Sequence, residues 1–192
     1  MTTSQAAGSA RPYHHGDLRR ALLAAAVEEL AERGATGLSL RDLARRVGVS
    51  HAAPRHHFGD KTGLLTAIAA EGFRLQAERL ERAWIETGSF LEVGVAYVGF
   101  AAGHRAYFEL MYRPELLRLD DPELVAARAA SSAMLYGPVR TVPGGEQEPR
   151  TAGIAAWALV HGVATLYLSG NLPAAEASDP EALARRVAAH LF

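Results

Sequence analysis

The chain of 192 residues contains no cysteine, so disulfide bonds and thiolate metal sites are excluded. No apolar run approaches the roughly 20 residues of a membrane-spanning helix, and the N-terminal tail lacks the apolar region of a signal peptide. No segment of any length alternates apolar and polar residues with the period of two that is typical of a strand. These absences predict an all-α protein of the cytoplasm.

Sequence signatures of catalysis and of metal binding are missing as well. Ser169, His161 and Asp179 are the residue types of a hydrolytic triad, but no nucleophile-elbow glycines surround the serine and no Gly-rich phosphate loop is present. The pairs His14–His15 and His56–His57 lack a third ligand at i+3 or i+4, and adjacent side chains on a helix diverge by about 100°. We therefore expect no enzyme, no bound metal and no cofactor.

Charge is divided unevenly along the chain. Residues 1–61 hold nine Arg and Lys against six Asp and Glu, a net charge of +3, together with five of the eight histidines. The remainder holds eleven against fifteen, a net charge of −4, so the overall value of −1 hides a basic N-terminal part. Such a basic part on an acidic remainder is the electrostatic footprint expected of a nucleic-acid-binding module.

A short amphipathic helix is predicted at Leu40–Val47. Its apolar residues recur at i, i+3, i+4 and i+7 and are Leu40, Leu43, Ala44 and Val47. Ser39 stands at the N-cap position with Asp42 three residues on, which is close to the capping-box pattern. Gly48 can take a positive φ and end the helix. The arginines of this helix lie off its apolar stripe.

A second short helix is predicted over about His51–His57, with Ser50 as its cap and Phe58 as its large apolar anchor. Two short helices joined by a turn of about three or four residues are the geometry that sets a recognition helix in the DNA major groove. A helical hairpin with a solvated basic face has the same pattern. The stretch alone leaves both interpretations open.

Two runs in this part of the chain match a known family. The first is Y-H-H-G-D-L-R at Tyr13–Arg19, and the second is the pattern S-x-A-A-P-Y-x-H-F-x-x-K. Residues that match the second pattern are Ser50, Ala52, Ala53, Pro54, His57, Phe58 and Lys61. With them, the segment from Tyr13 to about Gly72 resembles the N-terminal domain of TetR-family bacterial transcriptional repressors. Arg55 departs from the pattern, since the family has an aromatic residue there, usually a tyrosine that contacts a DNA phosphate.

The resemblance implies a helix-turn-helix head at residues 13–60. Residues 1–12 are small and polar, with Gly8 and Pro12, and this composition predicts a disordered arm. The resemblance also implies a pseudo-palindromic operator as the DNA partner. The residues expected to face DNA are Arg41, Ser50, His51, Ala52, Pro54, Arg55, His56, His57 and Lys61. Arg41, Arg55, His57 and Lys61 are predicted to face phosphates, and an arginine at position 55 keeps the family's phosphate contact as a charge-assisted one. The Pro54 ring is predicted to touch a thymine methyl.

A looser resemblance lies near the other end of the chain. The run Trp157–Gly162, W-A-L-V-H-G, resembles the Trp-His-Gly signature of one class of TetR C-terminal domains. It implies that residues 61–192 form a body that binds an apolar small-molecule effector and makes a homodimer. The residues expected to line the effector cavity are Tyr97, Phe100, Tyr107, Met111, Met134, Trp157 and His161. By default these side chains are core, because periodicity does not separate a lined pocket from a filled interior.

Caps and glycines predict the remaining elements. The predicted helices are 16–33, 61–84, 90–103, 104–112, 121–137, 151–169 and 181–191, with a coreless loop over 138–149. The helix at 151–169 is apolar nearly all round, so we expect one side to face a second subunit. The interface is predicted to contain Leu159, Val163, Leu166, Leu183 and Val187. The resulting hypothesis is a homodimeric, ligand-responsive repressor, and the alternative is a DNA-binding dimer with no small-molecule ligand.

Overall fold

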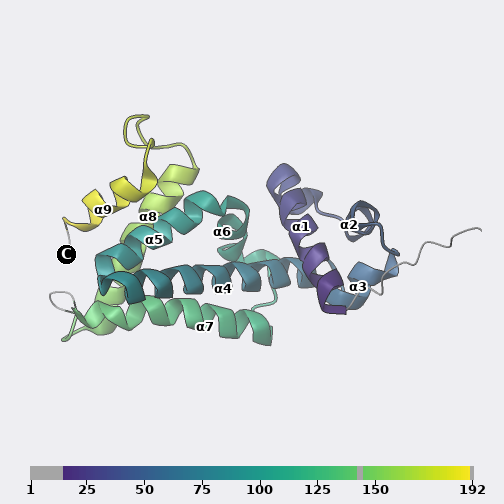
Figure 1. Ribbon diagram of the computed structural model, residues 1–192, viewed down its shortest axis with the longest axis horizontal. Helices are drawn as coiled ribbons and strands as arrows, with labels where there is room; N and C mark the ends of the chain where they lie inside the picture. The colour runs from purple at the N-terminus through teal and green to yellow at the C-terminus, as the bar shows by residue number, and fades with distance from the viewer. Residues whose placement is uncertain (1–14, 142–144, 191–192) are drawn as a thin grey trace, which may run out of the picture.

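The computed structural model describes residues 15–141 and 145–190, and within them every regular element is a helix (Figure 1). The all-α prediction is confirmed. The α-helices are α1 (His15–Gly37), α2 (Leu40–Val47), α3 (Ala52–Phe58), α4 (Lys61–Thr87), α5 (Phe90–Gly103), α6 (Arg105–Met111), α7 (Pro122–Tyr136), α8 (Pro149–Leu168) and α9 (Pro180–Ala188). Two 3₁₀ helices, η1 (Pro114–Leu116) and η2 (Pro138–Thr141), follow α6 and α7. The predicted arm, residues 1–12, lies outside the described residues.

The head is built from α1, α2 and α3, which gather at one end of the molecule (Figure 1). Within α1 the helical dihedrals break at Gly34, with φ 68° and ψ 174°, so the predicted stop at this glycine is confirmed. For α2 the predicted bounds are confirmed. The Asp42 backbone N–H donates to the Ser39 hydroxyl at 3.5 Å, and Gly48 ends the helix with φ 73°.

The start of α3 differs from the prediction. His51 has helical dihedrals, φ −60° and ψ −20°, but occupies the N-cap position and provides no side-chain cap. Ser50 takes part in the start of the helix through its backbone carbonyl, which accepts a hydrogen bond from the Ala53 N–H at 3.0 Å. The predicted Ser50 side-chain cap is therefore wrong, because the chain enters the helix through this backbone bond.

Two residues separate α3 from the long helix α4, which extends from the head into the body (Figure 1). The Asp60 carboxylate caps it by accepting the Gly63 N–H at 2.9 Å, as predicted. It ends three residues later than predicted, because Gly88, with φ 61°, is the first residue that turns the chain. A single rigid element thus joins the recognition helix to the body.

Gly63 is the tightest point of this junction, and Gly63→Ala should be strongly destabilising. An added Cβ would overlap the backbone carbonyl oxygen of Phe58, the last residue of α3, and backbone cannot move aside as a flexible side chain can. We expect a loss of about 2–3 kcal/mol in the free energy of unfolding, measured by urea denaturation. Gly103→Ala is the matched control, since an added Cβ there meets no atom within 4 Å and should be neutral or slightly stabilising. Equal stability of the two variants would contradict this account of the junction.

The body packs around α5, which contacts α4, α8 and α9, while α7 lies along α4 (Figure 1). Nine residues of α5 are buried, as its almost uniformly apolar sequence predicts. The predicted coreless loop after α7 is wrong at its start. Pro138 and Val139 are buried in η2, with Val139 fully inaccessible, because this apolar pair packs against α5 and α8.

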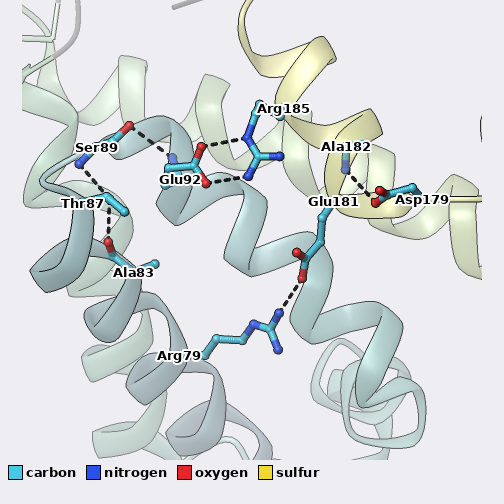
Figure 2. A network of polar contacts seen from close by, with 9 residues as sticks. All are labelled: Arg79, Ala83, Thr87, Ser89, Glu92, Asp179, Glu181, Ala182 and Arg185. Atoms are coloured by element: carbon cyan, nitrogen blue, oxygen red, sulfur yellow. Dashed lines mark hydrogen bonds and ion pairs between the residues drawn. The ribbon is translucent and has the colours of Figure 1, made fainter.

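Two ion pairs fasten α9 to the rest of the body (Figure 2). Arg79 of α4 donates to Glu181 at 2.6 Å, and Arg185 donates to Glu92 of α5 through both Nε and Nη2 at 2.8 Å. The first pair crosses α5 at Gly99, where a Cβ would overlap the carboxylate. Small size at Gly99 thus allows α4 and α9 to meet over α5.

The helix α8 is an apolar helix that its own protomer covers only in part. By length and composition alone, with a mean hydropathy of 1.4, it could cross a membrane, contrary to the prediction that no run approaches this length. This is weak evidence for a membrane span, because core helices of soluble proteins have the same composition. Seven of the twenty residues of α8 are exposed in the protomer, which leaves an apolar face that a second subunit could cover.

Candidate DNA-binding surface and effector cavity

The outer face of the head is the candidate DNA-binding surface. Six of the nine residues predicted to face DNA are exposed: Arg41, Ser50, His51, Ala52, Arg55 and His56. His57 and Lys61 are half-buried. In Figure 1, α2 and α3 lie at the end of the molecule remote from α9. The recognition helix is therefore presented away from the body.

Two arginines of this surface have no acidic partner among the described residues. Arg45 pairs with Asp42 at 2.8 Å within α2. Arg46 pairs with the carboxylates of Glu28 at 2.8 Å and Glu32 at 3.4 Å, both in α1, and so links α2 to α1. In the described part of the chain, Arg41 and Arg55 are exposed and free of ion pairs, which leaves their guanidinium groups available to phosphates.

Lys61 has a partner within the protein. Its Nζ donates to the Thr36 carbonyl oxygen at 2.9 Å and so closes the end of α1 against the start of α4. A cation near the C-terminal end of a helix is favourable because the last carbonyls carry partial negative charge. Lys61 therefore has a structural role in the free protein, and a phosphate would have to share its remaining N–H groups.

Pro54 lies on the wrong face for the predicted base contact. It is buried together with Phe58, one turn further along α3. Pro54 is also the third residue of α3, where a backbone N–H has no partner within the helix, so the proline costs no helical hydrogen bond. The predicted thymine contact is therefore wrong, and the ring instead anchors α3 on the head.

The centre of the body holds a polar cluster around the Tyr97 hydroxyl. Trp157 Nε1 donates to this oxygen at 3.1 Å, and the Tyr112 hydroxyl and His161 Nδ1 lie at 2.7 Å and 2.9 Å. Tyr97 is fully buried, which raises the pKa of its hydroxyl far above the usual value, so it stays protonated. One hydroxyl thus joins α5, α6 and α8.

Tyr97→Phe should destabilise the protein because it leaves three polar groups without this partner. Buried groups that lose a hydrogen bond cost about 1–3 kcal/mol, so we expect a loss in that range in chemical denaturation. Tyr107→Phe is the control, because the half-buried Tyr107 hydroxyl has no hydrogen bond within the described residues and its loss should change stability by less than about 0.5 kcal/mol. Equal free energies of unfolding for the two variants would contradict the stabilising role of the cluster.

His161 gives this cluster a predicted pH dependence. Burial lowers the pKa of His161 below its ordinary value of 6.5, so the folded protein keeps the imidazole neutral while the unfolded chain takes up a proton. As the pH falls below about 6.5 the unfolded state gains protons that the folded state lacks, and stability falls, by at most about 1.4 kcal/mol per pH unit for one proton. His161→Gln should show a smaller decrease over the same window when both are titrated with urea. An identical pH profile would contradict the assignment.

Three of the seven residues predicted to line the effector cavity instead fill the core. Tyr97 and Phe100 are fully buried, and Met111 is 4% exposed. Phe100 stacks on the His104 ring, with centroids 4.8 Å apart. For these residues the prediction of a lined cavity is wrong in this structure, because neighbouring side chains occupy the space.

A hollow of about 520 Å³ lies between α6 and α8. Its walls are formed by Arg105, Phe108, Glu109, Tyr112, Arg113, His161, Thr165, Leu168 and Ser169. Of the seven predicted effector residues only His161 is among them, and Tyr107, Met134 and Trp157 are half-buried elsewhere. His161 therefore connects the hollow to the cluster around Tyr97. We call this space the effector cavity.

The wall of the effector cavity does not form a hydrolytic triad. His161 uses Nδ1 on Tyr97, and the Ser169 hydroxyl donates to the Leu166 carbonyl at 3.2 Å. Asp179, the third residue type considered, caps α9 through the Ala182 N–H. These contacts fix each residue in a structural role.

Sequence reasoning missed the charged edge of this cavity. Arg105, Glu109 and Arg113 follow one another at i, i+4 and i+8, and the same three residues line a second hollow of about 410 Å³ between α6 and α1. The spacing of Arg105 and Glu109 was a signal that these two side chains share one face of α6, while Arg113 follows the end of that helix. Sequence reasoning also missed Tyr112, because its spacing from the other aromatic residues of this segment fits core packing as well as a cavity wall.

The predicted dimer interface is partly internal. Val163 and Leu183 are each 8% exposed and pack inside their own protomer, so their assignment to the interface is wrong. Leu159 and Val187 are half-buried, while Leu166 is 45% exposed. The exposed residues of α8 that do not line the effector cavity are Arg150, Thr151, Ile154, Ala155, Ala158 and Leu166. We call these residues the α8 face.

Comparisons with known proteins agree with this architecture. The model of the family described as "Bacterial regulatory proteins, tetR family" matches residues 22–68, and the model described as "Tetracyclin repressor-like, C-terminal domain" matches residues 90–191. The HTH-type transcriptional regulator BetI of an Escherichia coli strain is 30% identical over 161 residues, which cover 76% of this chain and 79% of BetI. These matches are transcriptional regulators, not enzymes.

Solved structures share the fold over nearly the whole length. A protein of unknown function from Rhodococcus sp. RHA1 is 37% identical, with a TM-score of 0.79 over 94% of this chain and 96% of its own. FadR from Bacillus subtilis, solved in complex with stearoyl-CoA, is 19% identical, with a TM-score of 0.68 over 90% of this chain and 97% of its own. The C-terminal model alone covers more than half of the chain. The chain therefore belongs to the TetR family of bacterial transcriptional regulators.

Proposed function

We propose that this regulator is a ligand-responsive repressor that binds a pseudo-palindromic operator as a homodimer in the cytoplasm. In this proposal residues 13–60 bind DNA, and residues 61–192 bind the effector and form the dimer. The observation that carries it is the exposed outer face of the head, where Arg41 and Arg55 have no acidic partner among the described residues. A repressor needs such a surface free for phosphates when no effector is bound.

The body supports the effector half of the proposal through one short segment. Tyr112 and Arg113 line the effector cavity, and five residues beyond Arg113 the Arg118 guanidinium donates to Asp60 at 2.6 Å. The Arg118 backbone N–H also donates to the Thr66 hydroxyl at 3.0 Å. Asp60 caps α4 directly after α3. An effector that displaces Tyr112 or Arg113 therefore pulls on the junction that orients the recognition helix.

A relative's printed description supports the same half of the proposal. FadR was solved with stearoyl-CoA, so this fold accommodates an organic ligand in that protein. In the present chain the effector cavity of about 520 Å³ is within the range of small-molecule sites. Thr165 lies on its wall and is exposed, so a larger side chain at this position would fill the space.

A reporter gene behind an operator selected by the protein tests the proposal. We expect the wild-type chain to lower expression, and a compound screen to yield molecules that restore it. Thr165→Trp should still repress but respond to none of these molecules. Raised expression in the presence of the protein would make it an activator, and restoration that persists in Thr165→Trp would move the effector away from this cavity.

The alternative, a DNA-binding dimer without a small-molecule ligand, is favoured by one observation. The side chains of Tyr97, Phe100 and Met111 fill the core that the family resemblance implied to be open. On this alternative the reporter stays repressed with every compound, and Thr165→Trp behaves as the wild-type chain. The same screen therefore decides between the two functions.

A further inference from the structure

We propose that the effector is an amphipathic organic anion, whose acidic group is bound by the guanidinium groups of Arg105 and Arg113. This inference rests on the proposed effector cavity and names the class of ligand that fits it. The apolar part of such a molecule would lie against Phe108 and Leu168, which share the wall with the two arginines.

The balance of charge on the wall favours an anion. Arg105, Arg113 and Glu109 are its charged side chains, so two cations face the cavity with one carboxylate. Glu109 already accepts from Arg105 Nε at 2.8 Å. The carboxylate partner of Arg113 is Glu115, which is not part of the wall. On the wall itself the cations therefore outnumber the carboxylate by two to one, and a cationic ligand would find only a carboxylate that is already paired.

Both arginines also have donors to spare. Arg105 and Arg113 each use only Nε on a carboxylate, so their Nη groups have no partner among the described residues. Arg185 shows the contrasting arrangement, with Nε and Nη2 both bound to Glu92 (Figure 2). Guanidinium groups bind carboxylate and phosphate through two parallel N–H donors. The unused Nη groups are the donors that an acidic ligand group needs.

Neutral polar groups complete the wall without opposing an anion. Burial lowers the pKa of His161, so its imidazole is neutral, and Tyr112 offers a hydroxyl that already contacts Tyr97. Phe108 is 3% exposed and forms an apolar floor. Arg105, Glu109 and Arg113 also line the hollow between α6 and α1. An anion that draws these arginines toward the effector cavity therefore alters the contact between body and head.

Isothermal titration calorimetry of the full chain without DNA tests the proposal with four probes that share an eight-carbon chain: octanoate, octyl phosphate, octanol and octylamine. We expect the two anions to bind at least tenfold more tightly than the alcohol and the amine. Arg113→Met should weaken octanoate binding roughly 10- to 100-fold, because charge-assisted hydrogen bonds are lost. Arg82→Met, at an exposed arginine of α4 away from the cavity, is the matched control and should change nothing.

Glu109→Gln provides a variant with the opposite sign. It removes the carboxylate that competes for Arg105, so octanoate should bind several-fold more tightly. The inference is overturned if none of the probes binds, if octanol or octylamine binds as tightly as octanoate, or if neither Arg113→Met nor Glu109→Gln changes the octanoate affinity. Octanoate binding that depends on Arg113 but leaves operator DNA bound would uphold the ligand class and contradict the proposed ligand-responsive function.

Discussion

Leu166→Glu should convert the protein from a dimer into a folded monomer and weaken operator binding by about 10²–10⁴-fold. Leu166 is 45% exposed in the protomer, so a glutamate there is tolerated by the fold but would be buried unpaired against a second α8 face. The loss in DNA affinity follows because two linked recognition helices bind far more tightly than one. Light scattering and fluorescence anisotropy with operator DNA measure the two effects.

Two other substitutions give this experiment its controls. Leu119→Glu changes an equally exposed leucine, 47%, that lies outside α8, and should remain dimeric. Val163→Glu changes a buried residue of α8 and should unfold the chain, because Val163 packs inside its own protomer. A folded Leu166→Glu variant that is still dimeric would show that another surface makes the dimer.

Arg55→Ala should weaken DNA binding by a similar factor for operator and random DNA and reduce its salt dependence. Each phosphate contact contributes about 0.9 to the slope of log affinity against log salt concentration. A homodimer loses two contacts with each substitution, so we expect the slope to decrease in magnitude by about 2 for Arg55→Ala and by about 4 when Arg41→Ala is added. Fluorescence anisotropy over a series of salt concentrations provides the measurement.

Arg45→Ala is the matched control for the salt series. Arg45 is also an exposed head arginine, with 72% of its side chain accessible, but it pairs with Asp42 within α2. Its removal should leave the slope nearly unchanged. A slope that changes equally for Arg45 and Arg55, or a loss of affinity confined to one operator sequence, would contradict the assignment of Arg55 to a phosphate.

Local features of the fold were predictable because their causes are close together in the sequence. The bounds of α2 follow from four apolar residues at helical spacing, with Ser39 and Gly48 as its ends. The end of α4 was misplaced only because Gly88, and not Trp84, carries the signal that stops a helix. Spacing and turn chemistry therefore located the α-helices of the described chain, but not the first residue of α3 or the short helix η2.

Which side of a helix faces the core was harder to predict than where the helix begins and ends. Because α8 is apolar nearly all round, its sequence did not show that Val163 faces inward and Leu166 outward. Pro54 was assigned to DNA on family grounds, although its spacing of four residues from Phe58 fits a buried face of α3. When several sides of a helix have the same polarity, tertiary packing and not the sequence pattern decides which side faces the core.

The effector cavity was beyond the reach of the sequence because distant residues form it. Its wall combines residues from 105–113 with residues from 161–169, and no periodicity links these two segments. His161, which the sequence predicted as an effector contact, lies on the wall of this cavity, whereas no role was predicted for Arg105 or Arg113. Only the approach of α6 to α8 brings them into one wall.

Selection of bound sequences from a random DNA pool tests the central claim most directly, that α3 of a homodimer recognises an operator. The account predicts enrichment of an inverted repeat whose half-site centres lie one helical turn, about 10 base pairs, or a multiple of it apart, since the dimer places two recognition helices on one face of the duplex. Leu166→Glu should fail to enrich this repeat under the same salt conditions. Enrichment of a single unpaired half-site by the wild-type chain, or no enrichment over the starting pool, would contradict the claim.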